Sequence, residues 1–165
     1  MKCFYHNADL DGHCSGAIVK MKYPECELIG INYGQPFPWE RLPDPREQVF
    51  MVDFSLQPFG EMIKLHFRCE LTWIDQHIAA IRSAAEAGYD HIIHGRGTDG
   101  SAACQLCWEW FFPRDPFPRA VWLLGRYDVW DHTNPAVLPF QYGFRLYGTD
   151  LAQHPEVMSL WKAFF

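Results

Sequence analysis

One histidine and two aspartates occur close together near the start of the chain, in the heptapeptide HNADLDG that spans residues 6–12. His6, Asp9 and Asp11 follow the short apolar run CFY and lead into a turn that Gly12 permits. Three chargeable groups at this spacing cost free energy unless a cation compensates them. The heptapeptide therefore predicts one part of a metal site.

Further acidic residues follow other apolar runs. Asp53 comes directly after VFMV, and Asp75 comes after LTWI. His77 stands two residues beyond Asp75, and Asp128 closes the run LLGRYD. Because parallel strands place their carboxyl ends at one edge of a sheet, we expect these groups to converge on His6. A single aspartate at a strand end is commonly a turn or cap residue, so the prediction depends on several of them coinciding.

The expected donor set consists of carboxylate oxygens with a smaller share of imidazole nitrogen. Such a set favours Mn²⁺ or Mg²⁺ over zinc, which is more often held by thiolates. More ligands are present than one ion takes from a protein, so we expect two ions that share a bridging carboxylate. Two ions about 3.5–4 Å apart can clamp a phosphoryl oxygen and activate water for in-line attack.

A glycine-rich segment, HGRGTDGS at residues 94–101, has a complementary character. Arg96 can hold a phosphate with two hydrogen bonds, and Gly97 and Gly100 leave backbone N–H groups accessible. Ser101 is expected to cap the following helix, whose N-terminus favours an anion. These four residues predict a site for a substrate phosphate. The equal alternative is an ordinary glycine-rich turn with a solvated arginine.

These residues must be positioned by alternating strands and helices, a pattern typical of βαβ units. Expected strands are Lys2–Tyr5, Glu27–Asn32, Val49–Val52, Glu70–Ile74 and His91–His94. Expected helices are Gly12–Lys22, Gln57–Phe67, Ile78–Ala87, Ser101–Phe111, Arg119–Tyr127 and Pro135–Tyr147, while the proline-rich stretch 33–47 is expected to be a loop. The sequence predicts one α/β domain over residues 1–165, with a mostly parallel sheet of about five strands flanked by helices on both faces.

Composition narrows the class of partner. The formal net charge of −6 weighs against tight, sequence-independent binding to nucleic acid, although two divalent ions would offset most of it. No secretion signal and no apolar stretch of about 20 residues is present, so we expect a cytoplasmic protein without a membrane span. Cys104 and Cys107 form a lone C-x-x-C in a helix-like run, which favours buried thiols over a zinc site.

With these residues in place, the chain resembles the DHH phosphoesterase superfamily over roughly residues 2–132. His6-x-x-Asp9-x-Asp11 is similar to the first family motif, and Asp53 stands in the second. Asp75-Gln76-His77 resembles the third motif, and Asp128 ends a segment similar to the fourth. Four motifs in the family order are far more specific than any one of them.

The resemblance implies a metal-dependent phosphohydrolase with Mn²⁺ or Mg²⁺ ligands at His6, Asp9, Asp11, Asp53 and Asp128. Asp53 would bridge two ions, and Asp75 would orient its neighbours. His77 would face the substrate phosphate as a hydrogen-bond donor or proton relay, and the 97–101 turn would lie beside that phosphate. The implied substrate is a short single-stranded oligonucleotide, a nucleotide-derived phosphodiester or a small phosphate ester.

Two departures from the family pattern qualify this expectation. Gln76 occupies the place of the first histidine of Asp-His-His, and its neutral amide oxygen is a poorer metal donor than imidazole. The second ion is therefore expected to bind weakly, only with substrate, or not at all, unless His132 substitutes as a ligand. The chain also ends before the C-terminal substrate-binding domain of the family.

Three explanations for the missing domain stay open: a fragment, a one-domain variant, or a subunit whose partner supplies the second half. The aromatic ending WKAFF, residues 161–165, either docks on its own domain or meets a second copy or partner lobe. The alternative function is a metal- or nucleotide-binding domain with little turnover.

Overall fold

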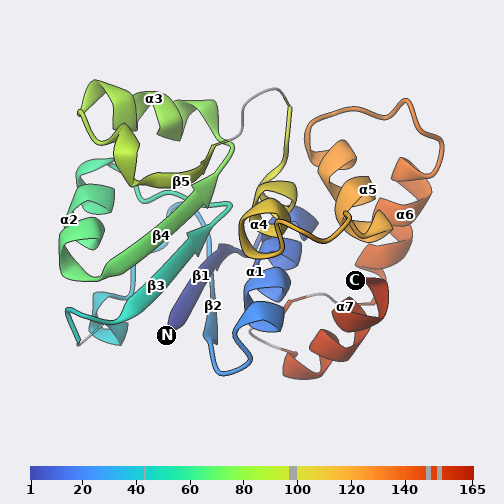
Figure 1. Cartoon of the computed structure of the whole chain (residues 1–165), viewed down its shortest axis with the longest axis horizontal. Helices are drawn as coiled ribbons and strands as arrows, with labels where there is room; N and C mark the ends of the chain where they lie inside the picture. Colours follow the sequence, from blue (N-terminus) through green and yellow to red (C-terminus); the bar gives the residue numbers. More distant parts are fainter. Residues whose placement is uncertain (43, 97–99, 148–149, 152–153) are drawn as a thin grey trace.

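The computed structural model describes residues 1–42, 44–96, 100–147, 150–151 and 154–165. Its centre is a parallel sheet in the order β2-β1-β3-β4-β5 (Figure 1). The strands are β1 (Lys2–His6), β2 (Glu27–Ile31), β3 (Gln48–Val52), β4 (Glu70–Asp75) and β5 (Ile93–Arg96). The first four match the predicted strands within one residue at each end. The fifth begins two residues later than predicted, because residues 90–92 form a 3₁₀ turn in which the Ile92 N–H donates to the Tyr89 carbonyl.

Seven α-helices lie in the described part of the chain, together with single 3₁₀ turns at Trp39–Arg41, Asp90–Ile92 and Pro155–Val157. The α-helices are α1 (Leu10–Lys22), α2 (Gly60–Arg68), α3 (Ile78–Glu86), α4 (Ala103–Phe111), α5 (Arg119–Asp128), α6 (Val137–Arg145) and α7 (Met158–Phe164). Six of them correspond to predicted helices, with ends that differ by up to three residues. Within the described ranges, no helix has both the length and the apolar character that a membrane crossing would need.

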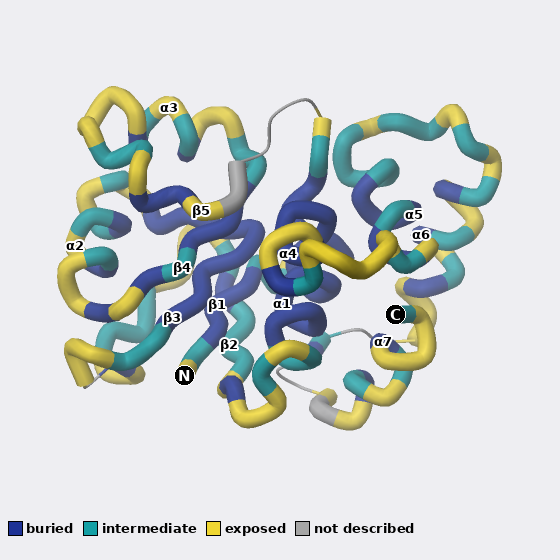
Figure 2. Tube along the Cα trace, in the orientation of Figure 1, coloured by how far each residue is buried: buried dark blue, intermediate teal, exposed yellow. Residues whose placement is uncertain are grey.

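The alternating side chains of the strands feed two hydrophobic cores, one on each face of the sheet (Figures 1 and 2). Tyr5 and Phe50 point into the core that α1 and α4–α7 complete. Phe4 and Trp73 point into the opposite core, where α2 and α3 pack. The predicted α/β architecture, with helices on both faces of a parallel sheet, is therefore confirmed.

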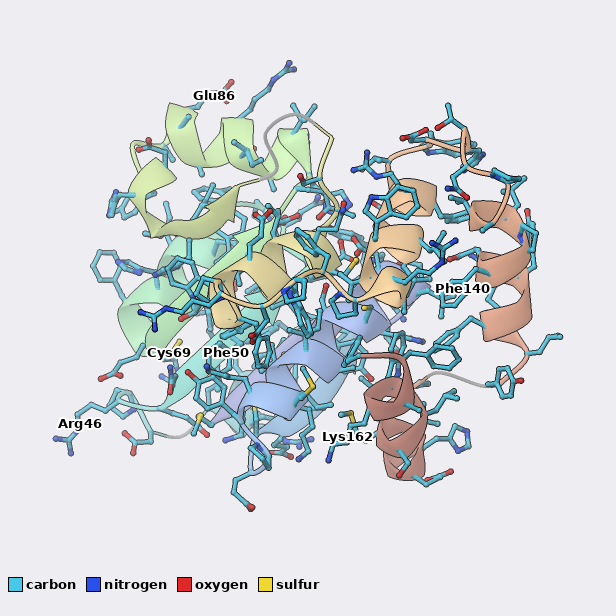
Figure 3. All side chains as sticks on the ribbon, turned by 45° about the vertical axis from the view of Figure 1, so that its right-hand side comes forward. Arg46, Phe50, Cys69, Glu86, Phe140 and Lys162 are labelled. Carbon is cyan, nitrogen blue, oxygen red and sulfur yellow. The ribbon has the colours of Figure 1, made fainter. Side chains whose placement is uncertain are left out.

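Mostly apolar side chains lie in the interior of the molecule, and most charged side chains lie at its surface. Figure 3 shows Phe50 inside the molecule and Arg46 and Glu86 at its outside. The Phe50 ring lies 5.6 Å from Phe111 of α4 and stacks on Tyr23 at 5.1 Å, which ties β3 to the helical layer. The sheet edge that carries the predicted site is thus held from behind by apolar packing.

The aromatic C-terminus docks on the chain itself. Trp161 of α7 is fully buried, and its ring lies 4.7 Å from Phe144 of α6. Phe164 stays partly exposed. Docking on its own fold, one of the two predicted readings, accounts for Trp161; an interface with a second chain stays a prediction.

All six cysteines are free and buried. Burial raises the pKa of the Cys104 and Cys107 thiols well above the ordinary value, which disfavours the thiolate that zinc requires. In the described residues, neither cysteine belongs to a group of side chains close enough to share an ion. The expectation of buried thiols at this C-x-x-C agrees with the structure.

Candidate metal centre

The turn after β1 fixes His6 against the start of α1. Asp9 is the N-cap of α1 and accepts a hydrogen bond of 3.0 Å from the Gly12 N–H. Gly12 lies so close to β1 that a Cβ atom there would stand 1.9 Å from the His6 carbonyl oxygen. Only glycine permits this approach, so Gly12 allows the start of α1 to lie directly against His6.

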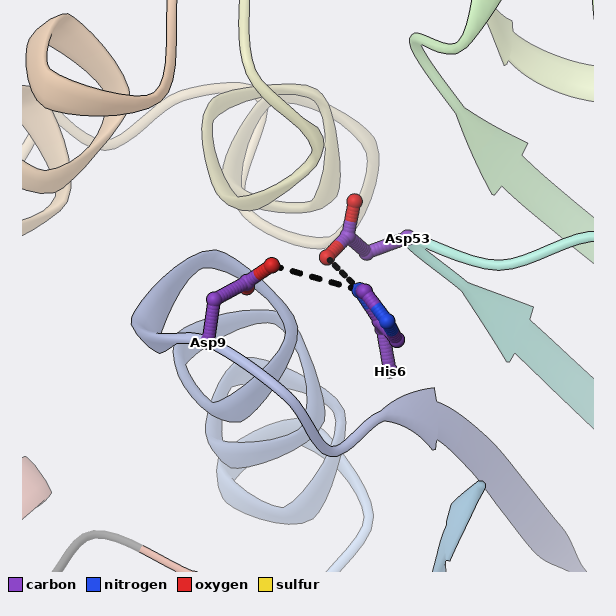
Figure 4. A group of neighbouring side chains, drawn as sticks. All are labelled: His6, Asp9 and Asp53. Carbon is purple, nitrogen blue, oxygen red and sulfur yellow. Dashed lines mark ion pairs between the residues drawn. The ribbon is translucent and has the colours of Figure 1, made fainter. Parts of the chain in front are cut away.

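His6, Asp9 and Asp53 face one another at the carboxyl edge of the sheet (Figure 4). The Nδ1 atom of His6 lies 3.2 Å from Asp9 Oδ2 and 3.5 Å from Asp53 Oδ2. Neither approach has hydrogen-bond geometry: His6 Nδ1 and Asp53 Oδ2 are both buried without a hydrogen-bond partner among the described residues. One ligand atom from each of the three residues thus lies within 4.8 Å of the other two.

Asp53 is presented by an unusual backbone conformation. Its φ of 54° lies in the left-handed region, which a non-glycine residue adopts at a cost of about 1–3 kcal/mol. The residue is only 1% exposed. The end of β3 is therefore held in a conformation that serves the orientation of its carboxylate rather than local stability.

A cluster of three carboxylates surrounds the amide of Gln76, which follows β4. Its Nε2 lies 3.0 Å from Asp53 Oδ1, 3.3 Å from Asp11 Oδ2 and 3.2 Å from Asp128 Oδ2. Gln76 Oε1 is buried and has no hydrogen-bond partner in the part of the chain that the structure describes. The predicted convergence of Asp9, Asp11, Asp53 and Asp128 is confirmed, and Gln76 lies at its centre.

Asp11 is held by the helix that was predicted to bind substrate. Its two oxygens accept hydrogen bonds from the backbone N–H groups of Ala103 (3.0 Å) and Cys104 (2.8 Å), in the first turn of α4. The N-cap of α4 is Ala102, so the prediction that Ser101 caps this helix is wrong. A carboxylate of the protein takes the donors that we expected to be open to a substrate phosphate.

The remaining residues of the predicted phosphate loop are only partly described. Gly97 and the side chain of Arg96 lie outside the described residues. Gly100 has a φ of 77°, and its carbonyl accepts a hydrogen bond of 2.8 Å from Arg126. The role of this loop in phosphate binding stays a prediction.

Asp75 orients His77. Asp75 Oδ1 accepts a hydrogen bond from the His77 backbone N–H at 3.0 Å and lies 2.7 Å from His77 Nδ1. The indole N–H of Trp73 donates to the other oxygen of Asp75 at 3.3 Å. The hydrogen bond with Asp75 raises the pKa of His77, whose side chain is 40% exposed. His77 is thus a fixed, accessible proton donor at the rim, with Nδ1 3.9 Å from Asp53 Oδ1.

The protein compensates the charges of these carboxylates only in part. Burial raises the pKa of Asp11 and of Asp53 well above the ordinary value, and the neighbouring carboxylates raise both further. Burial and the charge of Asp9 raise the pKa of Asp128. Burial also opposes ionisation of Asp9, but the adjacent His6 imidazole and the hydrogen bond from the Gly12 N–H outweigh it and lower the pKa of this carboxyl. The cluster therefore needs protons or a cation.

The donor set fits a divalent ion. Ligand atoms of His6, Asp9 and Asp53 lie within 4.8 Å of one another, as do those of Asp53, Asp75 and His77. Asp53 belongs to both groups, but the resemblance gives Asp75 and His77 roles other than metal ligation, so the bridging role of Asp53 stays a prediction. Hard oxygen donors with one imidazole suit Mn²⁺ or Mg²⁺.

Sequence reasoning missed two features beside this centre. An aromatic hollow forms where the proline-rich loop after β2 meets the end of β3; the signal for it was the set of aromatic residues between the prolines of that loop. A second hollow next to Asp9 and Asp128 is lined by Tyr127, Trp130 and His132. His132 stacks on Tyr127 at 5.3 Å and, in the described part of the chain, belongs to neither group of side chains close enough to share an ion. Its role as a substitute ligand stays a prediction.

Comparison with known proteins supports the fold and leaves the function open. No protein-family model matches this chain, and none of the curated proteins matches it. Among solved structures, the chain is similar to an uncharacterised protein from Helicobacter pylori G27, with a TM-score of 0.57 and 18% sequence identity. The likeness covers 80% of this chain and 44% of that protein. This chain therefore spans less than half the length of its structural neighbour, and the two share a fold.

Proposed function

We propose that this protein is a metal-dependent phosphohydrolase that uses Mn²⁺ or Mg²⁺. The observation that carries the proposal is the pair of buried atoms without hydrogen-bond partners among the described residues, His6 Nδ1 and Asp53 Oδ2, that face Asp9. A buried carboxylate, a mostly buried imidazole and a partly exposed second carboxylate arranged in this way leave an electrostatic demand for a cation. The ordered motifs of the DHH superfamily agree with it.

The residues divide the chemistry among themselves. His6, Asp9 and Asp53 would hold the first ion, which supplies an activated water and polarises a phosphate oxygen when bound. His77 would donate a hydrogen bond from its other ring nitrogen to the substrate phosphate, because Asp75 engages Nδ1. Asp75 orients the imidazole and raises its pKa. The substrate class is a short oligonucleotide, a nucleotide-derived phosphodiester or a small phosphate ester.

Gln76 sets how many ions the centre takes. Its amide N–H₂ stands between Asp11, Asp53 and Asp128, where it compensates part of their charge. We propose that one ion binds at His6, Asp9 and Asp53, and that a second binds only when the Gln76 amide turns to offer Oε1. The second ion is then weaker than the first.

The same observation favours a second candidate function. An amide that fills the place between three carboxylates would also suit a metal- or nucleotide-binding domain with little turnover. In that case a partner lobe would complete the cleft. We propose a cytoplasmic location for either function, because six buried free thiols are typical of a reducing compartment.

Hydrolysis of bis(p-nitrophenyl) phosphate with added Mn²⁺ tests the proposal. Asp53→Asn keeps the shape of the side chain but removes the shared charge, and it should lower kcat at least about 100-fold, the loss expected when about 2.7 kcal/mol of transition-state stabilisation is removed. Asp115→Asn, an isosteric change at an exposed aspartate, should leave the rate unchanged. Activity that survives Asp53→Asn would refute the mechanism. An inactive parent that binds Mn²⁺ normally would favour the binding domain.

A further inference from the structure

A hollow of about 200 Å³ lies beside the candidate metal centre, where the segments after β2 and β3 meet. Its walls include four aromatic rings and two side-chain amides: Tyr33, Phe37, Trp39, Phe54, Asn32 and Gln57. An apolar protein cavity of about 150 Å³ accepts a benzene molecule, so this hollow has room for a flat ring. The residues of the metal centre itself do not line it.

The hollow adjoins the first metal ligand. The rings of Tyr33 and Phe54 lie 5.5 Å and 5.8 Å from the His6 imidazole, and 4.3 Å from each other. Phe54 directly follows Asp53, so the left-handed turn at Asp53 directs the carboxylate to the centre and the ring to the hollow. Tyr33 and Phe54 therefore line the hollow and also lie beside the His6 imidazole, so the two sites are neighbours.

The aromatic walls are held in place from behind. Phe37 packs on Phe4 of the buried core at 4.7 Å and against Trp39 at 4.7 Å. The ammonium group of Lys64 lies 4.0 Å from the centre of the Trp39 ring. Rigid aromatic surfaces lose little conformational entropy when a ring stacks on them, which favours binding.

The polar lining suits a ring that carries hydrogen-bonding edges. Asn32 Oδ1 is a buried acceptor with no hydrogen-bond partner within the described residues, and Gln57 adds a second amide. Side-chain amides offer both a donor and an acceptor, as the edges of nucleobases require. A purely apolar guest would leave the Asn32 acceptor unsatisfied.

We propose that this hollow binds the nucleobase of a substrate whose phosphate lies at the metal centre. The inference rests on the proposed function and narrows its substrate class to nucleotide esters. The base stacks on Tyr33 and Trp39, with a polar edge toward Asn32. Base stacking on aromatic side chains is tolerant of sequence, so the hollow favours nucleotides over simple phosphate esters without selecting one base strongly.

The aromatic group on the other side of the centre is less suited to this role. There the Tyr127 ring is stacked on His132 at 5.3 Å, and the Arg145 guanidinium lies 5.7 Å from the centre of the same ring. Trp130 is 84% exposed, so its ring lies in solvent rather than in an enclosed hollow.

Two matched substrates test the inference: thymidine 5′-p-nitrophenyl phosphate, and the analogue in which hydrogen replaces the base. Both release p-nitrophenol from the same sugar phosphate, so the ratio of their kcat/KM values reports the base alone. We expect a ratio of about 10 or more for the parent, equivalent to about 1.4 kcal/mol. Tyr33→Ala and Trp39→Leu should bring the ratio near one, and Tyr33→Phe should restore it.

Controls make each outcome decisive. Phe67→Ala, at an exposed aromatic residue of α2 that does not line the hollow, should keep the parent ratio. Thermal melting and circular dichroism confirm that each variant folds. A parent ratio near one, or a ratio that falls in Trp130→Ala but not in Tyr33→Ala, would overturn the inference.

A binding experiment separates this inference from the proposed function. Thymidine monophosphate is titrated into the Mg²⁺-loaded protein, and quenching of tryptophan fluorescence is recorded. If neither substrate is hydrolysed, the proposed function fails. The hollow is still supported when the nucleotide binds and Tyr33→Ala weakens it about 10-fold. Absence of binding in the parent, with or without turnover, refutes the nucleobase site.

Discussion

Gln76→His should convert a centre that takes one ion into a centre that takes two. In the parent, an entering second ion must displace an amide that lies 3.0–3.3 Å from three carboxylate oxygens. Each hydrogen bond to a charged acceptor is worth about 1.5–3 kcal/mol, so this displacement is costly. An imidazole adds a ligand without that competing donor. Groups that merely orient metal ligands change affinity by about 10–100-fold, so a direct ligand should tighten the second site at least about 100-fold, or about 2.7 kcal/mol.

Calorimetric titration with Mn²⁺ measures both affinity and stoichiometry, and electron paramagnetic resonance detects the spin coupling of two neighbouring ions. We expect one tight site in the parent and two in Gln76→His, with the coupled signal in the variant only. Gln76→Met removes the amide without adding a ligand, and should gain much less than the histidine variant. Two equally tight sites in the parent, or one site in both proteins, would refute this account of Gln76.

Four further predictions concern the site and the helices around it. Gly12→Ala forces a Cβ against the His6 carbonyl and should cost about 3 kcal/mol or more; this lowers Tm by about 6–12 °C in thermal melting. Gly143→Ala, in open space within α6, should stabilise the protein by about 0.5–1 kcal/mol. Because the raised pKa values of the buried carboxylates let the folded protein keep protons that the unfolded chain releases, the metal-free protein should lose stability as pH rises through those values. Mn²⁺ binding should then release protons into weakly buffered solution, and its affinity should rise with pH over the same range; no proton release would contradict the raised pKa values. Asp75→Asn should lower the pKa of His77 in an NMR titration, since the Asp75 carboxylate is the main cause of its elevation; an unchanged pKa would mean that another group holds the proton.

The fold could be predicted because its strands are short, continuous apolar runs between turns. A strand that is buried on both faces, such as β3, needs apolar residues at successive positions. Such a run therefore indicates where the strand begins and ends, and that it belongs to a parallel sheet covered on both sides. Helix ends were less accurate. Gln57–Phe67 was predicted, but the helix spans Gly60–Arg68. The edges of such helices depend on tertiary contacts that local sequence does not encode.

The convergence of the carboxylates could also be predicted, because parallel topology brings the ends of distant strands to one edge. The hydrogen bonds from Ala103 and Cys104 to Asp11 could not, since they join residues 92 and 93 positions apart through helix packing. Asp150 was missed for the same reason: it accepts hydrogen bonds from Tyr5 and Asn7 across more than 140 residues. Local patterns reveal which residues carry charge, but not which distant backbone groups will hold them.

The double anchorage of Asp11 affects how substitutions at this site can be interpreted. Its carboxylate joins the start of α1 to the start of α4, so an asparagine would turn an N–H₂ group toward one of the two backbone donors. A glutamate, which is longer by one methylene group, could not accept the same two hydrogen bonds without a shift of the helices. An inactive Asp11 variant is therefore ambiguous, because misassembly of the helical layer would produce the same phenotype. Asp53, whose carboxylate receives a hydrogen bond only from the Gln76 side chain among the described contacts, is the more diagnostic position for genetic dissection.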